Sequence, residues 1–173
     1  MNTHGMTVEQ LVATHGVALL RLAAMLAGTR TDAEDLVQNT LVRLLAHEQR
    51  LTQADSPVAY ARRTLVNEFI SEGRRAWRQK EYAVETLPER ATDAVVETTR
   101  PGPDDDAWRL LTTLPRKQRA VLALRYYEDL SDAEIADVLD ISASTVRSNA
   151  ARGLATLRGL LATRSTTTIE AGS

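Results

Sequence analysis

A row of short polar and cationic side chains lies along one side of the segment from Ser142 to Leu161. The row comprises Ser142, Ser144, Thr145, Arg147, Ser148, Asn149 and Arg152. Apolar residues recur at helical spacing on the other side, at Val146, Ala150, Leu154, Leu157 and Leu161. Hydroxyl, amide and guanidinium groups can contact phosphates and base edges in the DNA major groove. The segment is therefore predicted to be a helix that packs on one side and binds DNA on the other.

A second, shorter helix is predicted just before this segment. Ser131 and Glu134 have the spacing of a capping box, which marks a helix start. An apolar face follows at Ile135, Ala136 and Leu139, and residues 140–142 (Asp-Ile-Ser) break the helix, with Ser142 placed to cap the next one. Two helices joined by so short a turn are typical of a helix-turn-helix unit. An αα-hairpin packed in a bundle has the same periodicity, so periodicity alone leaves both open.

The longer segment LPRKQRAVLALRYYEDLSDAEIADVLDISASTVRSNAARGLATLR, residues 114–158, resembles the promoter-recognising domain four of bacterial sigma factors. This resemblance implies that the helix from Ser142 enters the major groove of the minus-35 promoter element. Two positions depart from the family pattern. Asp140 stands where glycine is usual, and aspartate tolerates the left-handed conformation of such a turn. Asn149 stands where many relatives have a basic residue. This difference affects which DNA sequence the helix prefers.

Three helices are predicted in the first half of the chain. Their start signals are Thr7 with Gln10, Thr31 with Glu34, and Ser56 with Pro57. Gly28 is placed to end the first helix, the second is expected to reach about His47, and the third about Trp77. Three helices of this length can enclose a core, so the first half is predicted to be a small all-α domain.

The motif DAEDLVQ, at residues 32–38, resembles the helix by which sigma domain two binds the clamp of core RNA polymerase. The resemblance implies that the polymerase-binding residues are Asp32, Glu34, Asp35, Gln38 and Asn39. The core of this helix is predicted to consist of Leu36, Val37, Leu41, Leu44 and Leu45. Asn39 stands where an acidic residue is usual. An acidic helix start, with carboxylates at the positive end of the dipole, is the alternative explanation of the same residues.

A cationic stripe is predicted on the third helix, opposite the apolar residues Val58, Ala61, Leu65 and Phe69. Its members are Arg63, Asn67, Ser71, Arg74 and Arg78, with Arg75 beside them. Such a stripe neutralises phosphates without reading bases. It resembles the sigma segment that engages the minus-10 element, and the preceding loop at residues 51–56 would then supply a pocket for unstacked bases. For Tyr60 and Trp77, packing is favoured over base contacts.

The charge is distributed unevenly along the chain, although the net charge is only −2. Residues 57–80 contain 6 basic and 2 acidic side chains, whereas residues 81–106 contain 2 basic and 8 acidic ones. The acidic stretch holds three prolines and lacks apolar periodicity, so it is predicted to be a linker. Its carboxylates (Glu85, Glu89 and Asp104 to Asp106) suggest two alternatives, a mimic of a nucleic-acid backbone in the polymerase channel or an extended spacer.

Composition argues against several functional classes. The chain has 173 residues, 43% of them hydrophobic and 4% aromatic, and it contains no cysteine, which excludes disulfides and zinc-thiolate sites. The three histidines, at positions 4, 15 and 47, lack metal-ligand spacing, and no phosphate-binding loop or nucleophile motif occurs. We therefore expect no enzyme activity, no cofactor and no metal. We also expect no membrane span and a cytoplasmic location, because no apolar run is long enough.

Together these features predict an all-α protein with two small helical domains. The expected boundaries are 7–80 for sigma region 2, 81–106 for the linker, 107–164 for sigma region 4 and 165–173 for a disordered tail. The chain resembles the extracytoplasmic-function class of sigma-70 factors, and in particular its actinobacterial sigma-E-like members. The resemblance implies core RNA polymerase and promoter DNA as partners. An anti-sigma protein is usual in this family, although no residue here points to one. The alternatives are a dimeric helix-turn-helix regulator and a helical interaction module that never meets DNA.

Overall fold

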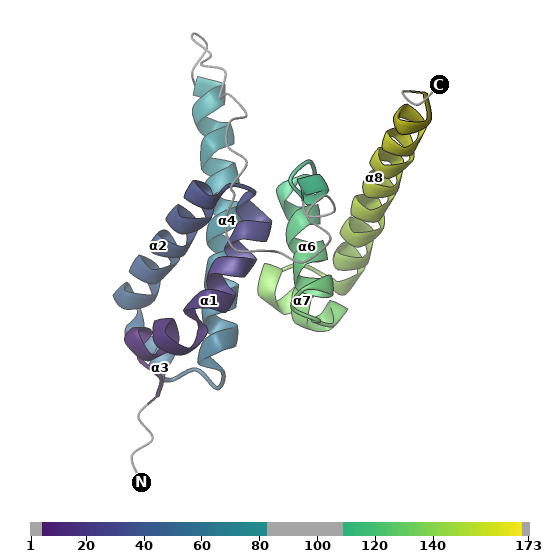
Figure 1. The fold of residues 1–173 in the computed structure, drawn as a ribbon. Coiled ribbons are helices and arrows are strands. Elements are labelled where there is room, and N and C mark those ends of the chain that lie inside the picture. Colours follow the sequence, from purple (N-terminus) through teal and green to yellow (C-terminus); the bar gives the residue numbers. More distant parts are fainter. Residues whose placement is uncertain (1–4, 83–108, 171–173) are drawn as a thin grey trace. The chain divides into compact units, whose positions relative to one another are not determined.

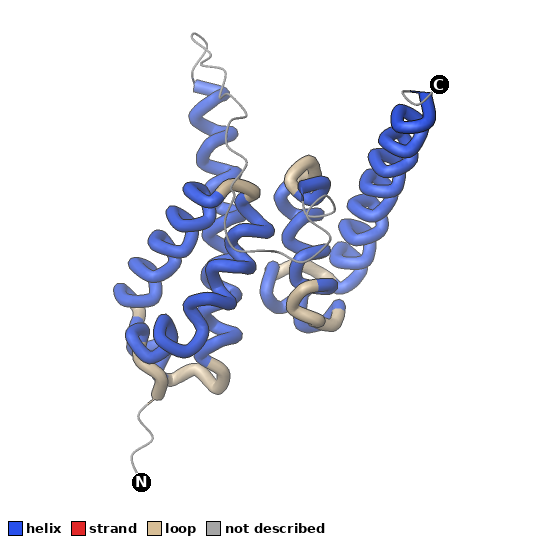
Figure 2. The backbone as a smooth tube through the Cα atoms, viewed as in Figure 1, coloured by secondary structure: helices blue, strands red, loops and turns tan. Residues whose placement is uncertain are grey.

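The computed structural model describes residues 5–82 and 109–170, and the regular structure in both ranges is α-helical (Figures 1 and 2). Contacts divide the chain into unit 1, Met1–Arg100, and unit 2, Pro101–Ser173. The predicted all-α class is thus confirmed. Most of the predicted acidic linker, including Glu85, Glu89 and the three aspartates, lies outside the described residues.

The described part of unit 1, residues 5–82, is built from four helices that share one core. Their bounds are α1 (Val8–Ala27), α2 (Arg30–Ala46), α3 (Glu48–Thr52) and α4 (Pro57–Tyr82). Helix α1 packs against both α2 and α4, α2 also packs against α4, and the short α3 contacts α2 and α4 (Figure 1). Helix α4 begins at the predicted proline but ends five residues beyond the expected Trp77, inside the stretch expected to be linker.

The predicted capping signals are confirmed at α1 but shifted at α2. The Thr7–Gln10 capping box forms in both directions, and Gly28 ends α1 with a φ of 89°, in the left-handed region. Helix α2 begins at Arg30, and its cap is Thr29, whose hydroxyl accepts the Asp32 amide at 3.1 Å. The predicted Thr31 cap is therefore wrong. Because Gly28 already reverses the chain, the next extended residue, Thr29, can start the new helix at once.

Unit 1 buries the apolar faces of its three long helices. The buried core includes Leu11, Leu22, Leu26, Leu36, Leu44, Leu65, Val66 and Phe69. Leu45, predicted to be core, is instead 57% exposed. Helix α1 is also long and apolar enough, by length and composition alone, to cross a membrane, contrary to the expectation that no run would be. One face of α1 lies in this core against α2 and α4, which accounts for much of its apolar character.

Unit 2 has the predicted helix-turn-helix. Its helices are α6 (Arg116–Tyr126), α7 (Asp132–Leu139) and α8 (Ala143–Glu170). The Ser131–Glu134 capping box opens α7, and Asp140 ends it in the left-handed conformation with a φ of 53°. The Ser142 hydroxyl then accepts the Thr145 amide at 3.1 Å and caps α8. Aspartate thus occupies the turn position that glycine usually takes, as its short polar side chain allows.

The core of unit 2 holds α7 and the first part of α8 against α6. The buried residues include Leu110, Leu111, Leu114, Val121, Leu124, Ile135, Val146 and Ala150. Leu161, predicted to face inward, is 49% exposed because α8 continues past its neighbours (Figure 1). The helical backbone of α8 extends to Glu170, beyond the boundary expected at residue 164, and residues 171–173 lie outside the described part.

Candidate nucleic-acid interface

The polar side of α8 is solvent-facing, as predicted, but its members are not equivalent. Ser144, Thr145 and Arg152 are exposed, while Ser148 and Asn149 are partly covered. The hydroxyls of Ser144 and Thr145 each lie 2.8 Å from the Ser142 hydroxyl, so the start of α8 carries a cluster of three linked hydroxyls. The Asn149 amide donates to the Thr145 carbonyl at 2.9 Å, within its own helix.

The two arginines of α8 have different surroundings. The Arg147 side chain is 62% exposed, and its Nη1 lies 3.8 Å from Oδ2 of Asp132, the first residue of α7. Oδ1 of the same carboxylate accepts a hydrogen bond from Arg125 near the end of α6. Arg152 is exposed and, within the described part of the chain, has no ion pair. One arginine is thus restrained by an acidic neighbour, and the other is free to move.

A partly buried arginine fastens the residues just before α6 to that helix. Arg119 donates to the backbone carbonyls of Thr112 and Leu114, which end the helical turn at residues 109–111. Burial, and then the positive charge of Arg116, lowers the pKa of the Arg119 guanidinium to about 10. The Arg119 side chain therefore still carries its positive charge near neutral pH. Its hydrogen bonds join Thr112 and Leu114 to α6, the helix on which α8 packs.

The cationic stripe of α4 is present but narrower than predicted. Arg63, Arg74 and Arg78 are exposed, and Asn67 and Ser71 are partly covered. Arg74 donates to the Ser71 hydroxyl at 3.2 Å, and Arg78 donates from Nε to the Arg74 carbonyl at 3.4 Å. These contacts leave N–H groups of both guanidiniums for other acceptors. Arg74 and Arg78 lie about one helical turn apart, and Arg63 lies about three turns before Arg74.

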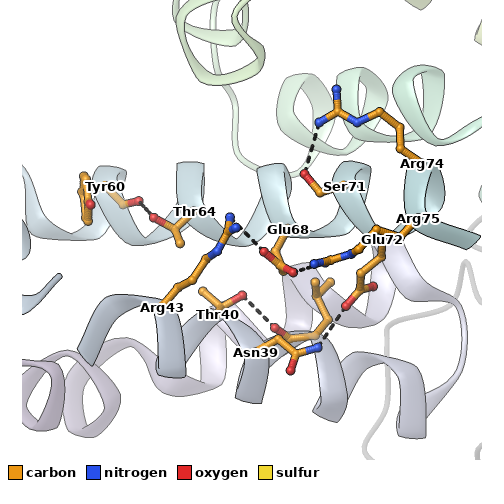
Figure 3. A network of polar contacts seen from close by, with 11 residues as sticks. Asn39, Thr40, Arg43, Tyr60, Thr64, Glu68, Ser71, Glu72, Arg74 and Arg75 are labelled. Carbon is orange, nitrogen blue, oxygen red and sulfur yellow. Dashed lines mark hydrogen bonds and ion pairs between the residues drawn. The ribbon is translucent and has the colours of Figure 1, made fainter. Parts of the chain in front are cut away.

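Arg75, predicted to lie beside the stripe, forms an ion pair with another residue of unit 1. It contacts Oε1 of Glu68, and Arg43 of α2 contacts Oε2 of the same carboxylate at 3.0 Å (Figure 3). Glu68 is 4% exposed, so its charge is buried between two half-exposed guanidiniums. The arrangement joins α2 to α4. The spacing of Glu68 and Arg75, two helical turns apart on α4, is a signal that sequence analysis missed.

The outer face of α2 combines carboxylates with exposed apolar groups. Of the predicted polymerase-binding residues, Asp32, Asp35, Gln38 and Asn39 are exposed and Glu34 is partly covered. Glu34 pairs with Arg30 at 2.6 Å, and the Asn39 amide donates to Glu72 of α4 at 3.1 Å (Figure 3). Val42 and Leu45 are 65% and 57% exposed. They continue the row of Asp35 and Gln38 at helical spacing, which indicates one continuous surface.

The predicted base-binding loop is shorter than expected. Leu51 and Thr52 belong to α3, and Leu51 is fully buried in the core of unit 1. Glu48 of α3 accepts the Val8 amide at 3.1 Å, which fastens α3 to the start of α1. Residues 53–56 are left to form the exposed connection before α4. Tyr60 is partly covered, and the side chain of Trp77 lies outside the described residues.

The described side chains do not form a metal site. Within residues 5–82 and 109–170, no group of three His, Asp or Glu side chains lies close enough together to hold a metal ion. The surfaces described above present hydroxyl, guanidinium, carboxylate and apolar groups.

Comparison with known proteins assigns both units. The family model for sigma-70 region 2 matches residues 11–79, and the model for sigma-70 region 4 matches residues 104–157. An RNA polymerase sigma-E factor of Streptomyces avermitilis is 36% identical over 157 residues, covering 90% of this chain and 86% of the relative. The ECF RNA polymerase sigma factor SigE of Mycolicibacterium smegmatis is 33% identical, covering 94% of this chain and 64% of the relative.

Solved structures show the same fold. The sigma factor RpoE of Bartonella quintana, in complex with the anti-sigma factor NepR, has a TM-score of 0.70 at 24% identity, covering 88% of this chain and 95% of that one. The two matched regions, both helical, define the class of protein. It is a sigma factor with two regions, and the second of them contains the helix-turn-helix. The chain belongs to the sigma-70 family, within the extracytoplasmic-function class of alternative sigma factors.

Proposed function

We propose that this alternative sigma factor binds core RNA polymerase and directs promoter recognition, promoter melting and transcription initiation. The single observation that carries the proposal is the pairing of two sigma-70 regions in one chain with an exposed polar face on α8. The alternatives of a dimeric regulator and of a DNA-independent interaction module lack such support, because the relatives that are at least 30% identical are named as sigma factors.

The polymerase-binding surface lies on α2. Asp32, Asp35 and Gln38 present their polar groups to solvent, and Val42 and Leu45 extend the row with apolar area. A polar rim around apolar anchors suits a protein interface, and the clamp helices of core polymerase are the partner that the family resemblance implies. Glu34 and Asn39 contribute less directly, since each already bonds within unit 1.

The DNA-binding surfaces lie on α8 and α4. The hydroxyl cluster at the start of α8, with Arg147, Ser148 and Arg152, enters the major groove of the minus-35 element. The stripe of Arg63, Arg74 and Arg78 holds the phosphates of the minus-10 element, and unstacked bases are captured at the connection at residues 53–56, which leads into α4. Arg75 is a structural member of unit 1 and only secondarily a DNA contact.

The chain itself performs no covalent chemistry in this proposal. Polymerisation belongs to the core enzyme, and the sigma factor contributes binding energy and placement. It needs neither a cofactor nor a metal. Because its partners are the transcription machinery and promoter DNA, it acts in the cytoplasm.

Free protein and holoenzyme differ in DNA affinity. The net charge of −2 and the small number of free arginines predict few phosphate contacts, hence weak and salt-sensitive binding by the chain alone. Two weak sites held by one polymerase gain about 10²–10⁴ in avidity through effective concentration. We therefore expect selective promoter binding only after assembly with core enzyme.

Reconstitution tests the proposal. The full chain is mixed with purified core polymerase and a genomic template library, and new transcription start sites are sequenced. A double variant, R147A with R152A, should still bind core polymerase while losing most of these starts, because its α2 surface is unchanged. Absence of a complex and of new starts would refute the sigma-factor proposal. Unchanged starts with the double variant would refute the role of α8.

We further propose that an anti-sigma protein holds this factor inactive. The specific support is that a structural neighbour, RpoE of Bartonella quintana, is complexed with the anti-sigma factor NepR. Co-purification of the chain from its own cells at low salt, followed by mass spectrometry, tests this. A stoichiometric partner that blocks core-polymerase binding is expected. Recovery of the chain only with polymerase subunits would refute it.

A further inference from the structure

The carboxylate of Asp132 links three helices of unit 2. One oxygen accepts from Arg125 of α6, and the other faces Arg147 of α8 at 3.8 Å. The Arg125 and Asp132 side chains are 24% and 30% exposed, so this pair is largely sheltered, whereas Arg147 reaches into solvent. The sheltered pair is therefore the anchor, and Arg147 is the exposed side chain held beside it.

We propose that Asp132 is a positioning residue that makes Arg147 selective for particular bases. This inference rests on the proposed function. An arginine side chain has about 2 kcal/mol of rotamer entropy, part of which is lost when its head binds. A carboxylate beside the guanidinium restrains it before DNA arrives, and the five N–H donors leave enough free to contact a base edge. The same negative charge also repels phosphates and discourages Arg147 from binding the backbone of any sequence.

The position of Arg147 on α8 supports this role. Ser144, Ser148 and Arg152 face away from the core, while Arg147 lies at the flank next to α7, where Asp132 can reach it. Arg152, without such a neighbour in the described part of the chain, is suited to a phosphate contact that carries no sequence information. Arg147 thus contacts base edges, and Arg152 contacts the phosphate backbone of the DNA.

The test uses holoenzyme made from core polymerase and the full chain, with a promoter library randomised in its upstream element. Base preferences are measured by sequencing the transcribed templates for wild type, D132N, R147A and the double variant. Asn is nearly the same size as Asp but lacks the charge. D137N is the matched control, because Asp137 is an exposed carboxylate on the same helix without an ion pair in the described residues. Thermal unfolding is measured in parallel.

D132N should lower the ratio of preferred to disfavoured bases by up to about fivefold, the upper end of the range for one exposed ion pair. The loss should fall on the positions whose preference disappears in R147A, and D132N should change nothing further in the R147A background. D137N should match wild type. A wild-type profile for D132N, an equal change with D137N, or a change that persists with R147A would overturn the inference. Wild-type holoenzyme that enriches no sequence would overturn the proposed function as well.

Discussion

The two units use charged side chains in different ways. In unit 1, Glu68 is buried, and Arg43 and Arg75 are drawn toward it from two helices (Figure 3). In unit 2, the charged groups of α8 stay on its outer side, and only Arg147 has an acidic neighbour among the described residues. A basic stripe in a sequence is therefore not yet a nucleic-acid surface. Part of it belongs to the architecture of unit 1, and the remainder is available for binding.

The largest effect is expected from removing the buried carboxylate. Glu68→Ala should lower the free energy of unfolding of unit 1 by about 2 kcal/mol, because two charge-assisted contacts are lost, one with Arg43 between α2 and α4 and one with Arg75 within α4. The cost stays below that of breaking a fully buried pair, since both guanidiniums are half-exposed and keep some hydration. Urea unfolding of the full chain, followed by circular dichroism, measures this loss.

Glu72→Ala is the matched control for this measurement. Glu72 lies one turn further along α4, is only partly covered, and accepts from Asn39 at 3.1 Å. Its removal should cost less than about 1 kcal/mol, because the Glu72 carboxylate is only partly covered and keeps much of its hydration. Equal losses for the two variants would show that Glu68 is no more structural than its neighbour, and the contrast between the units would fail.

A smaller effect should separate the adjacent arginines of α4. Arg75→Ala should lower the stability of unit 1 by up to about 1 kcal/mol, because the Glu68 contact is lost. Arg74→Ala should leave stability within about 0.5 kcal/mol. Promoter binding by the Arg74→Ala holoenzyme should instead weaken, and its salt dependence should become shallower by about one unit of slope, as for one lost phosphate contact.

Filter binding across a salt series and thermal unfolding together check this pair. The two variants remove the same charge from neighbouring positions, so a general electrostatic effect would change both measurements alike. A steep loss of DNA binding for Arg75→Ala without any loss of stability would place Arg75 in the DNA-binding stripe after all.

Local signals in the sequence predicted the fold well. The capping boxes at Thr7 and Ser131, the proline start of α4 and the turn at Asp140 all depend on residues within four positions of each other. The α2 cap was misplaced by two residues because Thr29 and Thr31 are both acceptable caps. Only the abrupt end of α1 at Gly28 decides between them.

These local signals do not predict which side chains of different helices contact each other. Arg43 and Glu68 are 25 positions apart and meet only because α2 packs against α4. Asp132 lies in the first turn of α7, an ordinary place for a carboxylate, and no local pattern indicates its contact with Arg147. Leu45 fits the apolar period of α2 but lies where that helix has no covering neighbour in the described part of unit 1. The candidate site was therefore predicted as a set of residues, and their division into structural and binding members required the structure.

The smallest effect tests whether the end of α8 is independent of the unit 2 core. A methyl group added at Gly159 would point into open space, whereas one added at Gly153 would lie 3.0 Å from Cδ1 of the buried Leu122. Gly159→Ala should stabilise unit 2 by up to about 0.5 kcal/mol, less than the full helix-propensity gain because helix ends fray. Gly153→Ala should lose stability instead, since Leu122 has little room to move. Thermal unfolding compares the two variants. A gain in stability at both positions would mean that α8 packs loosely on α6. The fixed placement of Arg147 beside Asp132, which depends on this packing, would then be unsupported.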